Sequence, residues 1–82
     1  VDVREPGEHR SARIPGAQLH PLSAFDPRNL PSEPGKVLVI ACAAGGRSLR
    51  AATACAQSGL PATNLTGGLA AWHKAGLPVE RG

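Results

Sequence analysis

The sequence has few aromatic side chains and no apolar stretch long enough to cross a membrane. Phe25 and Trp72 are the only aromatic residues, and neither tyrosine nor methionine occurs. The core is therefore expected to be aliphatic and rich in alanine. The longest apolar run, residues 37–44, is far shorter than the ~20 residues of a membrane-spanning helix. No signal-peptide pattern is visible. We therefore expect a cytoplasmic domain that does not bind membranes.

Cysteine is scarce as well, with only Cys42 and Cys55 in the chain. Neither belongs to a Cys-x-x-Cys pair or to a cluster with histidines, which argues against a zinc site and against a redox dithiol. A loop and most of a predicted helix separate the two, so their Cα atoms are expected to lie beyond the ~7 Å limit of a disulfide. The sequence predicts two free thiols and no metal or other cofactor.

The length and composition are those of one small globular domain. A chain of 82 residues has room for a single core, and 41% hydrophobic against 18% charged residues favours a folded chain over a disordered one. The chain begins at Val1 without methionine and enters at once what resembles the end of a buried strand. We interpret residues 1–82 as a single domain that is truncated at its N-terminus.

The basic residues are dispersed along the chain. A net charge of +3 is compatible with nucleic-acid binding, but there is no basic block and almost no aromatic surface for stacking bases. The composition therefore argues against a nucleic-acid partner and favours a mild attraction for small anions. The basic residues are Arg4, Arg10, Arg13, Arg28, Lys36, Arg47, Arg50, Lys74 and Arg81.

The ten glycines and eight prolines of the chain mark short connections, and three of these glycines and six of the prolines divide residues 1–41 into short segments. The apolar start at residues 1–3 is expected to be the remnant of a strand. The following segments are predicted as a polar loop at 4–16 that ends in the turn Ile14-Pro15-Gly16, a short strand at 17–19, at most a short helix at 22–30 interrupted by Pro27, and a turn at 31–35.

The second half carries the strongest pattern. Residues 36–41 form a continuous β-branched and aliphatic run, typical of a strand buried on both faces in a parallel sheet. Residues 47–58 are predicted to be helical and to end before Gly59. A short strand at 62–65, a turn at Gly67-Gly68 and a helix at 69–75 complete a right-handed α/β arrangement. The apolar residues at helical spacing around the first helix are Leu49, Ala52, Ala56 and Leu60.

The segment between the central strand and this helix is the candidate site. A loop from the carboxyl end of a strand to a helix N-terminus presents main-chain N–H groups, which bind anions. A thiolate at Cys42 would lie at the mouth of such a cradle, and the helix dipole and Arg47 should both lower its pKa. The candidate binding residues are Ala43, Ala44, Gly45, Gly46, Arg47 and Ser48, with Cys42 as the nucleophile.

Several alternatives stay open for these residues. Arg47 either points into the cradle or pairs with a carboxylate, and Ser48 either caps the helix or donates its hydroxyl to the bound anion. Cys42 is a nucleophile or a small buried hydrophobe, whereas the position of Cys55 among alanines favours a structural role. Any of the three histidines is a conceivable base for Cys42, although solvated surface positions are favoured for them. The histidines are His9, His20 and His73.

Three segments in order resemble the rhodanese family of sulfurtransferases. The first joins Val1-Asp-Val-Arg-Glu-Pro-Gly-Glu-His9 to Arg13-Ile-Pro-Gly-Ala17, which is similar to an Asp-x-Arg strand end and an Ile-Pro-Gly-Ala turn. Cys42-Ala-Ala-Gly-Gly-Arg-Ser48 resembles the family's Cys-x-x-Gly-x-Arg-Ser loop. The closing Asn64-Leu-Thr-Gly-Gly68, Trp72 and Gly76-Leu-Pro-Val79 resemble its Gly-Gly, Trp and Gly-x-Pro pattern.

The resemblance implies an α/β fold of rhodanese type, a mainly parallel sheet flanked by helices on both faces, with an N-terminal strand and helix missing. It also implies a persulfide on Cys42, formed from a small anionic donor such as thiosulfate and passed to a thiol, cyanide or protein acceptor. Two departures are Arg13, where a histidine commonly stands, and a loop interior of alanine and glycine only. The second departure leaves substrate choice to the main chain, Arg47 and the flanking segments.

Two other functions remain as alternatives. Related phosphatases carry five residues between cysteine and arginine, whereas this loop has four, Ala43 to Gly46, a smaller ring that suits sulfur. A non-catalytic interaction module of the same fold is the other alternative. For the residues that match Asp-x-Arg, we expect a structural ion pair or hydrogen bond for Asp2 and a contribution of Arg4 to anion approach. Trp72 is expected to anchor the last helix on the sheet.

Overall fold

The computed structural model describes residues 1–31 and 33–82. Ser32, within the turn predicted at residues 31–35, lies outside the described residues. The helices are α1 (Pro6–Ser11), η1 (Leu22–Ala24), η2 (Pro27–Asn29), α2 (Gly46–Gln57) and α3 (Gly68–Lys74), where η denotes a 3₁₀ helix. The strands are β1 (Ala12–Arg13), β2 (Leu38–Ile40), β3 (Ala62–Asn64) and β4 (Glu80–Arg81).

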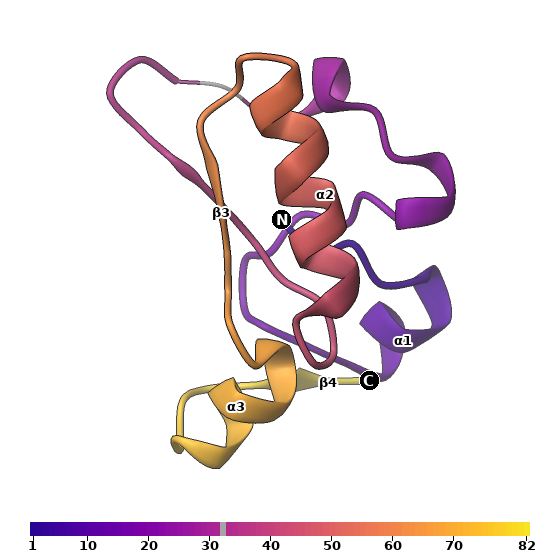
Figure 1. Ribbon diagram of the computed structural model, residues 1–82. Coiled ribbons are helices and arrows are strands. Elements are labelled where there is room, and N and C mark those ends of the chain that lie inside the picture. Colours follow the sequence, from indigo (N-terminus) through magenta and orange to yellow (C-terminus); the bar gives the residue numbers. More distant parts are fainter. Residues whose placement is uncertain (32) are drawn as a thin grey trace.

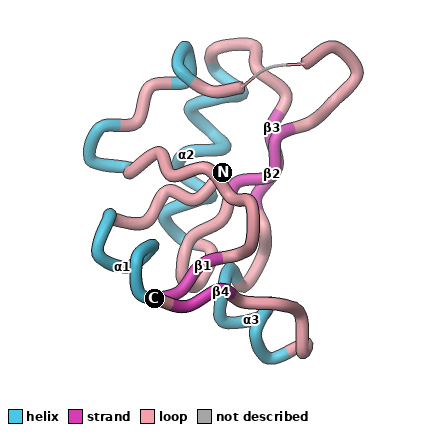
Figure 2. The backbone as a smooth tube through the Cα atoms, turned by 180° about the vertical axis from the view of Figure 1, so that it is seen from behind, coloured by secondary structure: helices cyan, strands magenta, loops and turns pink. Residues whose placement is uncertain are grey.

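Parallel pairing joins the strands at the centre of the molecule. Strands β2 and β3 lie side by side, with Ile40 opposite Asn64 (Figure 2). Asp2 extends this parallel pairing through single bridges to Ala41 and Leu19. The antiparallel pair of β1 and β4 lies at the end of the molecule that also carries α1 and α3 (Figure 2). The structure thus combines a parallel pair and a separate antiparallel pair of strands with helices, and the predicted α/β class is confirmed.

Helix α2 runs along β2 and β3 and covers one side of them (Figure 1). It begins and ends one residue earlier than predicted, and the face expected from its apolar residues is right only in part: Ala52 is buried and Leu60 packs against the core, but Leu49 is 56% exposed and Ala56 is exposed as well. The buried face consists of small side chains, Ser48, Ala51, Ala52 and Cys55. Small side chains let the helix approach the strands closely, so compact packing decides which face is buried.

The central strand is buried on one face only. Ile40 is fully buried beneath α2, whereas Val39 is 48% exposed, so the expectation of burial on both faces is wrong for this strand. Neighbouring strand residues point to opposite sides of a sheet. The uncovered side forms a hollow of about 320 Å³ lined by Val39, Leu65 and Trp72, among others. Trp72 of α3 lines the same hollow, and its ring N–H donates to the carbonyl of Pro78 at 2.6 Å.

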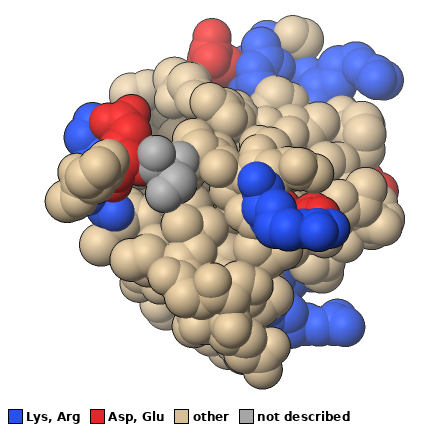
Figure 3. All heavy atoms as spheres, turned by 90° about the horizontal axis from the view of Figure 1, so that it is seen from above, with Lys and Arg blue, Asp and Glu red and all other residues tan. Residues whose placement is uncertain are grey.

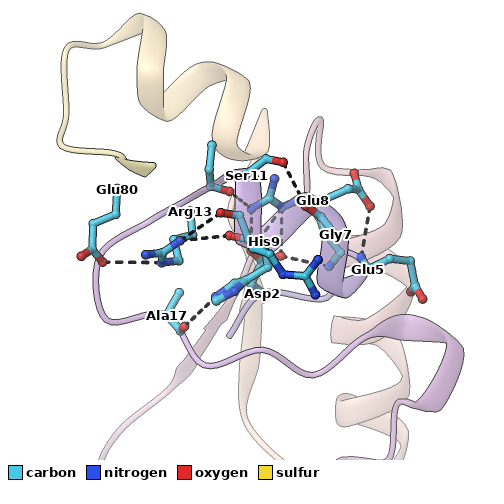
Figure 4. Close-up of polar contacts among 12 residues, drawn as sticks. Asp2, Glu5, Gly7, Glu8, His9, Ser11, Arg13, Ala17 and Glu80 are labelled. Carbon is cyan, nitrogen blue, oxygen red and sulfur yellow. Dashed lines mark hydrogen bonds and ion pairs between the residues drawn. The ribbon is translucent and has the colours of Figure 1, made fainter. Parts of the chain in front are cut away.

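The region predicted as a polar loop at 4–16 contains helix α1, so that prediction is wrong. Pro6 occupies the first turn, where its missing N–H costs nothing, and the main-chain N–H of Glu5 donates to the carboxylate of Glu8 at 3.1 Å. Figure 4 shows the polar contacts that connect this helix to its neighbours. His9 contacts the carbonyl of Ala17 at 3.3 Å. This contact joins helix α1 to the segment that leads to the bridge at Leu19.

The remaining segments are shorter than predicted. The strand expected at 17–19 forms one bridge, at Leu19, and the helix expected at 22–30 is the two 3₁₀ turns η1 and η2 on either side of Phe25. In one space-filling view the lysines and arginines stand in separate groups (Figure 3). Among the helices that the structure describes, none combines the length and hydrophobicity that a bilayer crossing requires.

Candidate active site

The candidate site lies where β2 ends and α2 begins. Cys42 follows the buried residues Ile40 and Ala41, and the loop turns into the helix at Gly45. Gly45 has a φ of 107°, a left-handed conformation that glycine adopts without a steric penalty. This conformation aims the main-chain N–H of Gly45 at the Cys42 sulfur, 3.0 Å away. The predicted convergence of loop amides on the thiol is therefore present in the structure.

The surroundings of the thiol favour its ionised form. Burial by itself raises the pKa of Cys42, but hydrogen bonds from the Ser48 hydroxyl and from the main-chain N–H groups of Ser48, Gly45 and Ala44 outweigh it and lower the pKa to about 7. The predicted direction is confirmed. The position expected for Cys42, at the mouth of the cradle, is wrong. The residue is only 2% exposed and lies beneath the loop. The exposed loop residues are Ala44 and Gly46.

Arg47 pairs with a carboxylate, which is one of the two roles considered for it. Its guanidinium donates to both carboxylate oxygens of Glu8, at 2.7 and 2.9 Å. These hydrogen bonds hold the pKa of Glu8 down at about 2 and raise that of Arg47. Because Glu8 comes from α1, the ion pair ties the start of α2 to the helix that was not predicted. Because the two charges cancel, Arg47 and Glu8 together add no net charge to the site.

Helix α3 holds the outer side of the loop. The N–H of Leu69 donates to the carbonyl of Cys42 at 2.8 Å, and the N–H of Ala70 donates to that of Ala43 at 3.0 Å. Gly68 permits this approach, since a Cβ at that position would lie 2.3 Å from the Cys42 carbonyl oxygen. With its carbonyls engaged by α3, the loop presents N–H groups to the sulfur. The sequence predicts only a turn at Gly67-Gly68, and no local pattern in it indicates this contact with the loop.

Ser48 neither caps the helix nor faces solvent. The cap position belongs to Gly45, and the fully buried Ser48 hydroxyl lies 3.3 Å from the Cys42 sulfur. The hydroxyl also contacts the side chain of Asn64 at the end of β3. Asn64 was noted in a family-like motif, but nothing in the sequence connected it to the thiol. The parallel register of β2 and β3 makes that connection.

Asp2 and Arg4 form a buried ion pair. The guanidinium of Arg4 donates to both oxygens of Asp2, at 3.1 and 2.8 Å, and both residues are about 95% buried. The structural role expected for Asp2 is confirmed. The expectation that Arg4 contributes to anion approach is wrong, because its charge is buried and already paired with Asp2.

Cys55 and the histidines stand apart from this chemistry. Cys55 is fully buried in α2, and burial raises the pKa of its thiol. Both cysteines are free. In the part of the chain that the structure describes, no hydrogen bond joins a histidine to Cys42. The amides and the Ser48 hydroxyl therefore favour the thiolate without help from a neighbouring base.

Comparison with known proteins identifies the family. The rhodanese-like domain profile matches residues 1–75. The chain belongs to the rhodanese-like domain family. A rhodanese-related protein from Thermoplasma volcanium has the same fold, with a TM-score of 0.86 and 33% identity over 98% of this chain and 80% of that one. The likeness covers the whole arrangement of strands, loop and helices described above.

Curated relatives of this rhodanese-like domain differ in length and in name. A protein named sulfurtransferase from Allochromatium vinosum is 35% identical over 80 residues, covering 96% of this chain and 75% of the relative. An uncharacterised Synechocystis protein is 42% identical over 82 residues, and the chain spans 46% of its length. A structure from Rhodopseudomonas palustris, described as a possible tyrosine phosphatase, has a TM-score of 0.79 and 35% identity over 96% of this chain and 67% of that one.

Proposed function

We propose that this rhodanese-like domain is a sulfurtransferase that carries a sulfane sulfur on Cys42. The observation that supports the proposal most directly is the convergence of main-chain N–H groups and the Ser48 hydroxyl on the Cys42 sulfur, with a pKa lowered to about 7. At neutral pH about half of such a thiol is ionised and nucleophilic. The sulfurtransferase name of a relative at 35% identity agrees with this chemistry.

The first half-reaction loads the sulfur. The Cys42 thiolate attacks the outer sulfur of a donor such as thiosulfate and forms a new S–S bond. The bond between that sulfur and the sulfonate breaks, and its electron pair leaves with sulfite. The product is a Cys42 persulfide anion, so the total charge is the same before and after the step. No proton, metal or redox partner is needed for this exchange.

The loop stabilises the negative charge that the transferred sulfur carries. Ala43, Ala44, Gly45 and Gly46 contribute main-chain groups and no side chain larger than a methyl group, so the loop offers the terminal sulfur main-chain N–H donors. The side chains at the ends of this segment are those of Arg47 and Ser48. Since Arg47 is engaged by Glu8, its effect on a substrate is that of a neutralised pair and not of a free cation.

The second half-reaction returns the free thiolate. A thiophilic acceptor, such as cyanide, a small thiol or a protein cysteine, attacks the terminal sulfur of the persulfide. The S–S bond to Cys42 breaks, and its electron pair stays on the Cys42 sulfur. Because donor and acceptor use the same site in turn, steady-state kinetics should be of the ping-pong type.

Intact-mass spectrometry after incubation with thiosulfate tests the proposal. The reduced protein should gain the mass of one sulfur atom, on the peptide that contains Cys42. Cys42→Ser should gain nothing, and the matched variant Cys55→Ala should load as the wild type does. Absence of a persulfide on the wild type, with thiosulfate and with an organic persulfide as donor, would refute the proposed transfer.

The same variants separate the two alternatives. A phosphatase would hydrolyse an aryl phosphate and lose that activity in Cys42→Ser; the possible tyrosine phosphatase among the structural relatives motivates this control. The four-residue spacing from Cys42 to Arg47 argues against it. A non-catalytic interaction module would bind its partner equally well with Cys42→Ser and would form no persulfide.

A further inference from the structure

Asn64 is the polar side chain at the site that the proposed reaction does not use. We propose that Asn64 is a positioning residue whose side-chain amide orients the Ser48 hydroxyl so that its proton points at the Cys42 sulfur. The proposal deepens the function proposed above, because it concerns what makes the same thiol reactive. Asn64 touches neither the thiol nor, in this mechanism, the substrate, and it acts through Ser48.

Three acceptors surround the Ser48 hydroxyl. Its oxygen lies 3.3 Å from the Cys42 sulfur, 3.2 Å from the carbonyl oxygen of Gly45, and within hydrogen-bonding distance of the Asn64 side-chain oxygen. A hydroxyl carries one proton and therefore donates fully to only one of them. Which acceptor receives that proton decides how strongly Ser48 stabilises a thiolate.

The Asn64 amide can resolve this competition. Rotating it about its terminal bond exchanges the side-chain oxygen for the NH₂ group with almost no other movement. The NH₂ group then donates to the Ser48 oxygen, and the Ser48 proton is free for the sulfur. A thiolate is the strongest acceptor of the three because the hydrogen bond to it is charge-assisted. The resulting chain runs from the Asn64 amide through the Ser48 hydroxyl to the Cys42 sulfur.

The rotated amide gives up no hydrogen bond on the side of the Asn64 nitrogen. Among the described residues, the hydrogen bond of the Asn64 side chain is the contact of its oxygen with the Ser48 hydroxyl, and its nitrogen donates to none. Rotation therefore keeps the contact with Ser48 and reverses the direction of the hydrogen bond.

The fold holds Asn64 in place for this role. Asn64 ends β3 opposite Ile40, two residues before Cys42, so the parallel register keeps it beside the strand end that supplies the thiol. Ser48 lies one turn into α2 and is fully buried, which excludes water as a competing partner. The charged side chains near the loop are held in two ion pairs, Arg47 with Glu8 and Arg4 with Asp2.

The test measures the thiol pKa from the pH dependence of alkylation by iodoacetamide. Asn64→Ala removes the donor and should reduce the alkylation rate of Cys42 at pH 7 about threefold. Asn64→Asp keeps the size but offers only acceptors and adds a negative charge, so the rate at pH 7 should fall about fivefold, equivalent to a pKa raised by about 1 from its value of about 7. Thr63→Ala, at the exposed neighbouring position of β3, is the matched control and should leave the pKa unchanged.

A double-mutant cycle with Ser48→Ala separates orientation from general damage. If Asn64 acts through the hydroxyl, Asn64→Ala should have no further effect on the Cys42 pKa in the Ser48→Ala background. An equal effect in both backgrounds, or an unchanged pKa in both Asn64 variants, would overturn the proposal. Asn64→Asp keeps the inference testable if Asn64→Ala fails to fold. Alkylation needs no sulfur donor, so this result stands or falls separately from persulfide formation.

Discussion

Gly68→Ala tests whether the close contact between α3 and the loop holds the site together. The added Cβ would lie 2.3 Å from the Cys42 carbonyl oxygen and 2.8 Å from the Ala43 carbonyl. Ordinary contacts begin near 3.4 Å, so the start of α3 must move away by roughly 1 Å. Such a shift breaks the two hydrogen bonds that Leu69 and Ala70 donate to the loop.

The expected cost has two parts. Alanine at the positive φ of Gly68, 58°, costs about 1 to 2 kcal/mol. Loss of two main-chain hydrogen bonds adds about 2 kcal/mol. The free energy of unfolding should therefore fall by about 3 to 4 kcal/mol, a large part of the roughly 4 to 12 kcal/mol expected for a chain of this length. Urea denaturation, followed by circular dichroism, measures the change.

Gly76 is a matched control. It has a φ of 79° just after α3, and a Cβ there would meet nothing within 4 Å. Gly76→Ala should lose only the backbone cost of about 1 to 2 kcal/mol. Gly68→Ala should also raise the pKa of Cys42 as the loop shifts, whereas Gly76→Ala should not. Equal losses of stability in the two variants, with equal thiol pKa values, would refute the reasoning.

The remaining predictions concern charges. Asp2→Asn should lower the free energy of unfolding by about 3 to 5 kcal/mol in urea, because it leaves a buried arginine unpaired, whereas Asp26→Asn, in an exposed pair of the same geometry, should change little. Glu8→Gln should cost less than about 1 kcal/mol, since solvent screens its pair with Arg47. That loss should shrink as the pH falls from 4.5 to about 2, where Glu8 itself becomes protonated. A difference in unfolding free energy between wild type and Glu8→Gln that stays constant over this pH range would contradict the prediction. Alkylation of Cys42 should rise through pH 7, and a midpoint near 9 would contradict the site geometry.

Local patterns predicted the elements that positioned the thiol. The aliphatic run before Cys42 forms β2, and the alanine-rich segment after it forms α2. A strand that ends in a small-residue loop and a helix start places main-chain N–H groups around the first loop residue, whatever the rest of the fold does. The lowered pKa of Cys42 followed from this local geometry, although the Ser48 hydroxyl contributes in place of Arg47.

Helix α1 shows a signal that was present and not used. Pro6 at the first turn and a glutamate pair three residues apart, Glu5 and Glu8, are features of a helix start. The six-residue helix has no buried residue, so no apolar periodicity marked it. Recognising the glutamate spacing would have corrected the predicted loop.

Several features were decided only by tertiary structure. The partner of Arg47 comes from a distant helix, and no local pattern distinguishes Glu8 from other carboxylates as that partner. The buried face of α2 depends on how closely small residues let the helix approach the strands, which hydrophobicity at Leu49 could not reveal. The sequence does not distinguish Gly68 from other turn glycines, because its need for a missing Cβ arises only from the closeness of the Cys42 carbonyl.

The sequence by itself determined the family, the α/β class and the residue proposed to carry the chemistry, because these depend on contiguous motifs and on the local geometry of a strand, a loop and a helix start. Tertiary structure alone decided the depth of the thiol, the pairing of Arg47 and the approach of Asn64 to Ser48. These depend on the register between β2 and β3 and on the packing of α1 and α3 against the loop. Such contacts join residues far apart in the chain. They form only when folding brings these residues together, so no local sequence pattern indicates them.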